Sequence, residues 1–265
     1  MPAINLLEGK TAIITGGTTG IGRAIALEYV RQGANVVINH LDLERDRPHL
    51  ASLLAEAEAI RPGVLSHLPG DVTDPATGAA LVQHAASLHG GRVDICVSNA
   101  GICQFAEFLT LEPDLFSRTV RTNLDGAFYV VQAAARHMAT GQQPPGGSII
   151  GISSISALVG GGLQTHYTPT KAGVLSLMQS CAVALGKHRI RCNALLPGTV
   201  KTQLNEEDLS DDAKRAYMEG RIPLGRTGVP HDLAGPAVFL ACEELSGYVT
   251  GAQLLVDGGL FVNLQ

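Results

Sequence analysis

The chain has 265 residues, of which 45% are hydrophobic and 16% are charged. This balance supplies enough apolar side chains for a sizeable core and excludes a largely disordered chain. The formal net charge is −5 and no cluster of Lys and Arg stands out, so nucleic acid is a poor candidate partner.

The N-terminus and the cysteines bear on the cell compartment. The first ten residues contain no basic region followed by a long apolar run, and no segment approaches the ~18 apolar residues of a membrane span. The five cysteines are odd in number and lack CxxC spacing, which is typical of free thiols in a reducing compartment. We therefore expect a cytoplasmic protein with no membrane partner and no metal site.

Short apolar runs recur along the chain, and turn residues with a longer amphipathic stretch follow most of them. We expect strands at Thr11–Thr15, Asn35–Asn39, Val64–Leu68, Val93–Ser98, Ser148–Ser153, Arg191–Leu196 and Gln253–Asp257. We expect helices at Gly20–Gln32, Leu43–Ile60, Pro75–His89, Pro113–Met138, Thr165–Lys187 and His231–Glu244. Apolar strands with helical spacers predict an α/β fold, a doubly wound parallel sheet of about seven strands flanked by helices. No linker divides the chain, so residues 1–265 are expected to form a single domain.

A glycine-rich turn joins the first expected strand to the first helix. Such a turn lets a dinucleotide pyrophosphate sit against the helix N-terminus. The candidate cofactor residues here are Gly16, Thr18, Thr19, Gly20, Ile21 and Gly22. The spacing is G-x-x-x-G-x-G, and a purely structural turn is the alternative interpretation.

The end of the second expected strand bears on the choice between NAD and NADP. An acidic residue directly at this end would bind the ribose 2′-hydroxyl and reject a 2′-phosphate. Asn39 and His40 stand here instead, and the nearest acid is Asp42. His40 with Arg45 or Arg47 could accept a 2′-phosphate, although these charges could simply solvate the next helix. We predict use of NADP without strong exclusion of NAD.

The third and fourth expected strands also end in candidate cofactor residues. Asp71, followed by Val72, could accept a hydrogen bond from the adenine amino group. The small residues of Asn99–Ala100–Gly101 would let the backbone pass close to the cofactor. Simple strand-end turns are the alternative for both segments.

Tyr167 and Lys171 are the candidate reactive pair, because their i, i+4 spacing places them on one face of a helix. A nearby ammonium, with the positive charge of oxidised nicotinamide, favours the phenolate and lowers the pKa of the tyrosine. The phenolate could then take a proton from an alcohol as hydride leaves carbon. Pro169 lies between the two residues and must fall in the first helical turn. The spacing is common by chance, so a surface helix pair is the default without further support.

Other polar residues supply that support. Ser154, thirteen residues before Tyr167, ends the fifth expected strand and could hold the substrate oxygen. The amide of Asn123, within a helical stretch, could fix a water that carries protons outward from the lysine. The turn after the sixth strand could contact the nicotinamide carboxamide through Pro197, Gly198, Val200 and Thr202.

Taken in chain order, these motifs resemble those of the short-chain dehydrogenase/reductase family, and the resemblance extends over essentially the whole chain. The shared positions are Thr15–Gly22, Asn99–Gly101, Asn123, Ser154, Tyr167, Lys171 and Pro197–Thr202. The resemblance implies a one-domain Rossmann-type fold, NAD or NADP as cofactor and often a homotetramer. It also implies that Tyr167 is the base, that Ser154 anchors the substrate and that Asn123 holds a water, while Lys171 also binds the nicotinamide ribose. Ser98 departs from the usual pattern, but Asn99 is retained.

The segments around the expected site are more distinctive. They are Ser153–Gly161, Gln164–Gly173, Leu204–Leu209, Tyr217–Arg226 and Gly251–Gln265. They resemble a branch of the family that oxidises L-rhamnose, which implies oxidation of the pyranose at C1 to L-rhamnono-lactone.

The residues themselves favour a polyol-like substrate, because hydroxyls and amides suit a sugar better than an acyl chain. The candidate substrate contacts are Ser154, Ser156, Gln164, Tyr167, Thr199 and Asn205. Ser156 and Thr199 could instead just complete strand-end turns.

The charged stretch Thr202–Arg221 is interpreted as a mobile lid, with the lid region at about 199–226, and a solvated surface helix is the alternative. His166 is expected to point off the catalytic face. Another aldose or polyol dehydrogenase, a carbonyl reductase and a dinucleotide-binding sensor without catalysis remain as alternative functions.

Overall fold

The structure is a computed structural model that describes residues 5–205 and 210–263. Its centre is a parallel sheet of seven strands in the order β3-β2-β1-β4-β5-β6-β7, which confirms the predicted fold class. The strands are β1 (Thr11–Thr15), β2 (Asn35–His40), β3 (Leu65–Pro69), β4 (Ile95–Ser98), β5 (Gly147–Ile152), β6 (Ile190–Pro197) and β7 (Gln253–Val256). Each lies within two residues of its predicted bounds.

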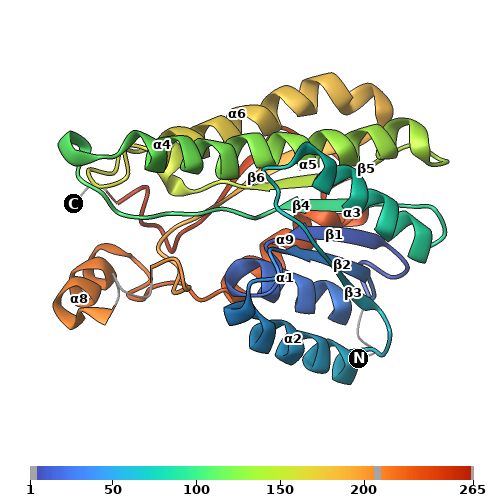
Figure 1. The fold of residues 1–265 in the computed structure, drawn as a ribbon, viewed down its shortest axis with the longest axis horizontal. Coiled ribbons are helices and arrows are strands. Elements are labelled where there is room, and N and C mark those ends of the chain that lie inside the picture. Colours follow the sequence, from blue (N-terminus) through green and yellow to red (C-terminus); the bar gives the residue numbers. More distant parts are fainter. Residues whose placement is uncertain (1–4, 206–209, 264–265) are drawn as a thin grey trace.

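Helices cover both faces of this sheet (Figure 1). One face packs against α1 (Gly20–Arg31), α2 (Arg47–Ile60) and α9 (His231–Ala241). The other packs against α3 (Pro75–Leu88), α5 (Gly126–Arg136) and α6 (Thr168–Leu185). The remaining α-helices with described bounds are α4 (Pro113–Val120), α8 (Asp212–Arg221) and α10 (Glu243–Ser246).

The inner strands β1, β2, β4, β5 and β6 are largely apolar because both of their faces are buried, whereas the edge strands β3 and β7 are only partly buried. Ile13 and Ile14 are adjacent in β1 and both are fully buried, yet they belong to different core clusters. Successive side chains of a strand point to opposite faces, so each strand contributes to both layers.

Several helix bounds differ from the prediction. The stretch predicted as one helix over Pro113–Met138 consists of α4, a π-helical turn η3 (Arg121–Asp125), α5 and a second π-helical turn η4 (His137–Gly141). The helix predicted from Leu43 begins with the short 3-10 turn η1 (Glu44–Asp46), and α9 and α10 divide the helix predicted at His231–Glu244.

The helix that carries Lys171 starts at Thr168 rather than at Thr165, so Tyr167 is its N-cap residue. Pro169 lies in its first turn, as required, because a backbone N–H is not needed there for an intrahelical bond. The prediction for Pro169 is confirmed.

The segment predicted as a lid is described in part. Residues 206–209 of that prediction, and with them the end of Leu204–Leu209, lie outside the described residues. The helix α8 buries none of its residues and lies apart from the helical layers in Figure 1. Asp211 caps it by accepting hydrogen bonds from the Ala213 and Lys214 N–H groups.

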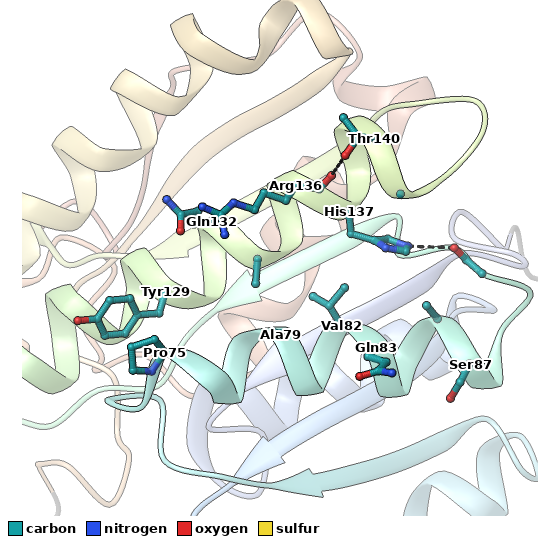
Figure 2. Close-up of a pocket in the computed structure, with 14 residues that line it drawn as sticks. Pro75, Ala79, Val82, Gln83, Ser87, Tyr129, Gln132, Arg136, His137 and Thr140 are labelled. Carbon is teal, nitrogen blue, oxygen red and sulfur yellow. Dashed lines mark hydrogen bonds between the residues drawn. The ribbon is translucent and has the colours of Figure 1, made fainter.

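A groove of about 730 Å³ lies between α3 and α5. Figure 2 shows Tyr129 of α5 beside Pro75 of α3, and Val82 of α3 pointing toward His137. None of the predicted site residues lines this groove. Among the described helices, none is long and apolar enough to cross a membrane.

Candidate active site

The glycine turn between β1 and α1 has the geometry of an anion-binding turn. Gly16 and Gly20 adopt φ values of 61° and 55°, which favour glycine. A Cβ on Gly22 would lie 2.3 Å from the Gly16 carbonyl oxygen, so only glycine permits this tight approach. No side chain caps the N-terminus of α1 at Thr19, and its N–H groups are available to an anion.

Asn99 fastens this turn to the end of β4. Its side-chain Nδ2 donates to the Thr15 and Gly16 carbonyl oxygens at 2.9 and 3.0 Å. The Thr15 hydroxyl accepts hydrogen bonds from the Asn99 and Ala100 N–H groups, both at 3.0 Å. Asn99 is therefore occupied with shaping the turn.

The turn after β6 lies across from the glycine turn. A Cβ on Gly20 would find Thr202 as its nearest neighbour at 3.5 Å. Asn205 accepts hydrogen bonds from the Thr202 N–H at 3.0 Å and from its hydroxyl at 3.2 Å. Asn205, predicted as a substrate contact, thus holds the turn that was predicted to contact the nicotinamide.

Thr199 and Val200 line a cavity of about 190 Å³, together with Arg226, Asp232 and residues of the turn after β7. Neither Ser154 nor Tyr167 lines this cavity. The Arg226 guanidinium donates to Asp232 at 2.7 and 2.9 Å, and this pairing lowers the pKa of Asp232 to about 2.

The end of β2 differs from its predicted role. His40 is buried, with 6% of its surface exposed. Its Nδ1 accepts a hydrogen bond from the Asp42 N–H, and its Nε2 contacts Nδ1 of His67, each at 3.0 Å. The expectation that His40 offers a charge to a 2′-phosphate is not met in this arrangement, because both ring nitrogens already have partners.

The neighbouring candidates at the ends of β2 and β3 also have local bonds. Asn39 donates to the Gly70 carbonyl oxygen at 2.9 Å, which joins the two strand ends. The Asp71 carboxylate accepts from the Thr73 N–H at 2.9 Å. Asp71 is nevertheless exposed, and Val72 is buried beneath it.

Tyr167, Lys171 and Ser154 converge at the end of β5 and the start of α6. The Lys171 Nζ lies 5.5 Å from the centre of the Tyr167 ring. It donates to the Ile152 carbonyl oxygen at 2.9 Å, while the Ser153 hydroxyl donates to the Lys171 carbonyl oxygen at 2.7 Å. Ser154 lies close enough to the Tyr167 phenol for its hydroxyl to lower the pKa of the tyrosine. The structure therefore brings the predicted trio together.

Burial dominates the acid–base properties of this trio. It raises the pKa of Tyr167 above its usual value, and the hydrogen bond from Ser154 opposes that rise. It lowers the pKa of Lys171 to about 8. The expected lowering of the tyrosine pKa is thus outweighed here, because removal of water from the phenolate costs more than the hydrogen bond returns.

Asn123 lies within η3, beside the lysine. A Cβ on Gly101 would meet its Oδ1 at 3.2 Å and the Lys171 Nζ at 3.5 Å. The Asn123 amide accepts from the Ile102 N–H and donates to the Ile102 carbonyl oxygen, at 2.8 and 2.9 Å. It also donates to the Thr170 hydroxyl at 3.2 Å. Both amide hydrogens are used, which leaves only Oδ1 or the main chain of Asn123 to hold a water.

Gln164 contacts Cys103, a residue that the sequence analysis did not include among the site candidates. The Gln164 Nε2 donates to the Cys103 sulfur at 3.3 Å. Cys103 is partly buried, and its charge would act on both Tyr167 and Lys171. Cys103 follows Asn99–Ala100–Gly101 by two residues, and this closeness to a cofactor motif was the sequence signal that could have identified it. Ser156 donates its N–H to the Ser154 hydroxyl at 3.1 Å.

His166 is completely buried, and neither of its ring nitrogens has a partner among the described residues. Its orientation relative to the catalytic face stays a prediction.

A glycine turn lies against an open helix N-terminus, and a serine, a tyrosine and a buried lysine meet at the end of β5. This combination defines a dinucleotide-dependent oxidoreductase. A family model described as enoyl-(acyl carrier protein) reductase matches residues 16–261. The chain belongs to the short-chain dehydrogenase/reductase family.

Two relatives are similar to this chain over almost its whole length. The chain is 60% identical over 260 residues to the L-rhamnose-1-dehydrogenase of Scheffersomyces stipitis, covering 98% of this chain and 99% of that protein. It is 56% identical over 262 residues to the L-rhamnose 1-dehydrogenase (NAD(P)(+)) of a Sphingomonas species, covering 99% and 100%.

A solved structure agrees with this assignment. The gluconate 5-dehydrogenase from Burkholderia cenocepacia, in complex with NADP and tartrate, matches with a TM-score of 0.88. Its sequence is 34% identical, and the match covers 98% of each chain.

Proposed function

We propose that this chain oxidises L-rhamnose at C1 to L-rhamnono-lactone with NAD or NADP as the acceptor. Two relatives at 60% and 56% identity over nearly their full length carry this activity in their names. The NAD(P)(+) designation of the second, and the NADP in the gluconate 5-dehydrogenase structure, support both cofactors.

The described residues fit such a cofactor. The turn formed by Gly16, Gly20 and Gly22 leaves the N-terminus of α1 open, and Gly20 faces Thr202 with no contact closer than 3.5 Å for an added Cβ. The pyrophosphate would sit on this turn, and the turn at Pro197–Thr202 would hold the carboxamide. When bound, the nicotinamide accepts the hydride that leaves C1 of the sugar.

The remaining chemistry belongs to the trio. Ser154 holds the C1 oxygen beside the Tyr167 phenolate, which takes the proton of the C1 hydroxyl as C1 becomes the lactone carbonyl. The Lys171 ammonium stabilises the phenolate and binds the nicotinamide ribose. A water held at Asn123 returns the proton from Lys171 to solvent.

The other sugar contacts are proposed at Ser156, Gln164, Thr199 and Asn205. Gln164 has the strongest structural support, because Cys103 and the backbone near Gly161 confine its side chain on two sides. Asn205 is proposed to act through its hold on Thr202, in addition to any direct contact.

The approach of Lys171 to the Tyr167 ring carries this proposal, since the lysine has no other evident reason to be buried there. The test is the absorbance of the reduced nicotinamide with a panel of aldoses and both cofactors. We expect turnover of L-rhamnose to a lactone, with L-lyxose and L-mannose as the next best substrates. Absence of activity on every 6-deoxy or L-aldose would refute the substrate.

The tyrosine is tested by Tyr167→Phe, which removes only the phenol oxygen. We expect kcat to fall by about 10²–10⁴-fold, the usual contribution of a general base, while the cofactor still binds. The kinetic assay and a fluorescence titration with NADPH measure the two effects. Turnover that survives this change would overturn the mechanism.

We further propose a homotetramer, a cytoplasmic location and a lid over residues 199–226. The lid is supported by α8, whose Lys214 Nζ lies 5.7 Å from the centre of the Phe105 ring in the loop that follows β4.

A further inference from the structure

The groove between α3 and α5 is open because small side chains line its floor. Ala79 and Ala86 of α3 and Ala133 of α5 stand where larger side chains would fill the space. The two helices come close at Gly78, where an added Cβ would lie 3.1 Å from the Val130 Cα. The volume of about 730 Å³ is within the usual range of small-molecule pockets, roughly 300–1,000 Å³. The groove is therefore large enough for a small organic molecule.

The groove is bounded at both ends. At one end, Tyr129 of α5 stands beside Pro75 of α3 (Figure 2). At the other end, the His137 Nε2–H donates to the Gly91 carbonyl oxygen at 2.9 Å, and this is one of the dashed lines in Figure 2. From Tyr129 to His137 the groove is roughly 12 Å long, at ~1.5 Å per helical residue.

Two polar side chains on the rim of the groove retain their donors. Gln132 and Arg136 lie one helical turn apart on α5, and Figure 2 shows their side chains next to each other. Neither side chain has a hydrogen bond or an ion pair among the described residues. Arg136 is exposed and Gln132 is half-buried. Their N–H groups are therefore available to one ligand.

The charge of the lining favours an anion. Among the described residues that line the groove none is acidic, whereas the Arg136 guanidinium is a permanent cation. The carboxylate of Asp74, just before α3, is used to cap that helix and accepts from the Ala76 N–H. The whole chain carries a net charge of −5, so the positive charge of the groove is a local property.

We propose that the groove between α3 and α5 is a second binding site, which takes medium-chain aliphatic carboxylates. The carboxylate accepts hydrogen bonds from Arg136 and Gln132. The alkyl chain lies along the alanine floor and Val82. At ~1.5 Å per bond, an extended chain of about eight carbons fits the length of the groove. None of the proposed sugar and dinucleotide contacts lines the groove, so the inference goes beyond the proposed function.

The probe is octanoate, and equilibrium dialysis of the radiolabelled compound measures its binding to the native chain. The dialysis is done at saturating NADP, which keeps the dinucleotide site filled. We expect saturable binding of one octanoate per chain. Absence of saturable binding would overturn the proposal.

Two substitutions test where the probe binds. Arg136→Gln should weaken octanoate about tenfold and leave the uncharged 1-octanol unchanged, because only the carboxylate uses the guanidinium. Ala79→Leu fills the floor and should weaken both probes. Ala80→Leu, at the adjacent exposed position of α3 outside the groove, is the matched control and should bind both as the native chain does. Native affinity for octanoate in either Arg136→Gln or Ala79→Leu would overturn the proposal.

A second copy of the chain is the other occupant to consider, and light scattering distinguishes it. We expect the native chain and Ala79→Leu to have the same mass in solution. A lower mass for Ala79→Leu, with no octanoate bound by the native chain, would show that a subunit fills the groove and would overturn the proposal. None of these measurements uses the sugar, so failure of L-rhamnose turnover would not affect their outcome.

Discussion

At the scale of single residues, Lys171 is a buried cation that destabilises the fold and takes part in the proposed reaction. Lys171 is 5% exposed, and the described hydrogen bond of its ammonium goes to the Ile152 carbonyl oxygen. Burial of a charged group destabilises the fold unless the charge is paired and hydrogen-bonded. The lowered pKa of about 8 expresses that cost directly.

The cost can be measured as a pH dependence of stability. Between about pH 8 and 10, the unfolded chain retains a proton that folded Lys171 has lost, so the free energy of unfolding rises with pH in this window. Its contribution reaches about 3 kcal/mol at most. Lys171→Met should abolish this rise, measured as the difference between denaturant titrations of the two proteins. Parallel pH profiles would contradict the lowered pKa.

Gln164 and Cys103 form the second pair at this scale. Gln164→Ala should raise the KM for L-rhamnose about tenfold or more, because a sugar hydroxyl loses its partner, with a smaller change in kcat. Cys103→Ser keeps an acceptor for the Gln164 amide and should come close to the native KM, whereas Cys103→Ala should not. Steady-state kinetics at saturating cofactor separate these outcomes, and equal effects of both cysteine variants would show that the thiol does not orient Gln164.

At the scale of elements, the residue types in the turns account for most of the structure that could be predicted from the sequence. The glycines of the turn after β1 indicate its backbone directly, since positive φ and a Cβ contact of 2.3 Å leave no alternative residue. The π-helical turn at η3 could not be predicted. Its cause is tertiary: Asn123 bonds to Ile102 in a different segment, and this places the amide beside Lys171.

The helix α8 is where the lid proposal can be tested. It contains Lys214, Arg215 and Arg221 and buries none of its residues, so trypsin should cleave it early. If it closes over the site, NADP with L-rhamnose should slow cleavage there severalfold. Cleavage after Arg189, in the exposed turn before β6, should not change and serves as the control. Equal rates at α8 with and without ligands would refute a lid.

At the scale of the whole molecule, the outer helices retain apolar side chains. Phe116, Phe128 and Val183 are 45%, 42% and 88% exposed, on α4, α5 and α6 respectively. These helices lie together over one face of the sheet in Figure 1. Exposed apolar surface of this kind favours association between subunits.

The expected assembly has about four times the 27.6 kDa mass of the chain. Val183→Asp would place a charge on this face and should reduce the mass measured by light scattering. Ser87→Asp on α3 adds the same charge to another exposed position and should leave the mass unchanged. A single-chain mass for the native protein would refute the homotetramer.

The sequence by itself determined the parallel α/β architecture and the glycine turn, because strand burial and backbone φ depend on local residue types. It also placed Lys171 on its helix, and Tyr167 and Ser154 close to the start of that helix and the end of β5, since helical spacing and strand ends can be read from pattern. Only the tertiary structure decided which candidates have free polar atoms. Asn99 proved to be bonded to the distant backbone of β1, Asn205 to Thr202 and His40 to His67. Cys103 proved to contact Gln164. The partners of Asn99 and Gln164, and His67 as a partner of His40, are far away in the chain, and hydrogen bonds between such segments leave no periodic trace in the sequence.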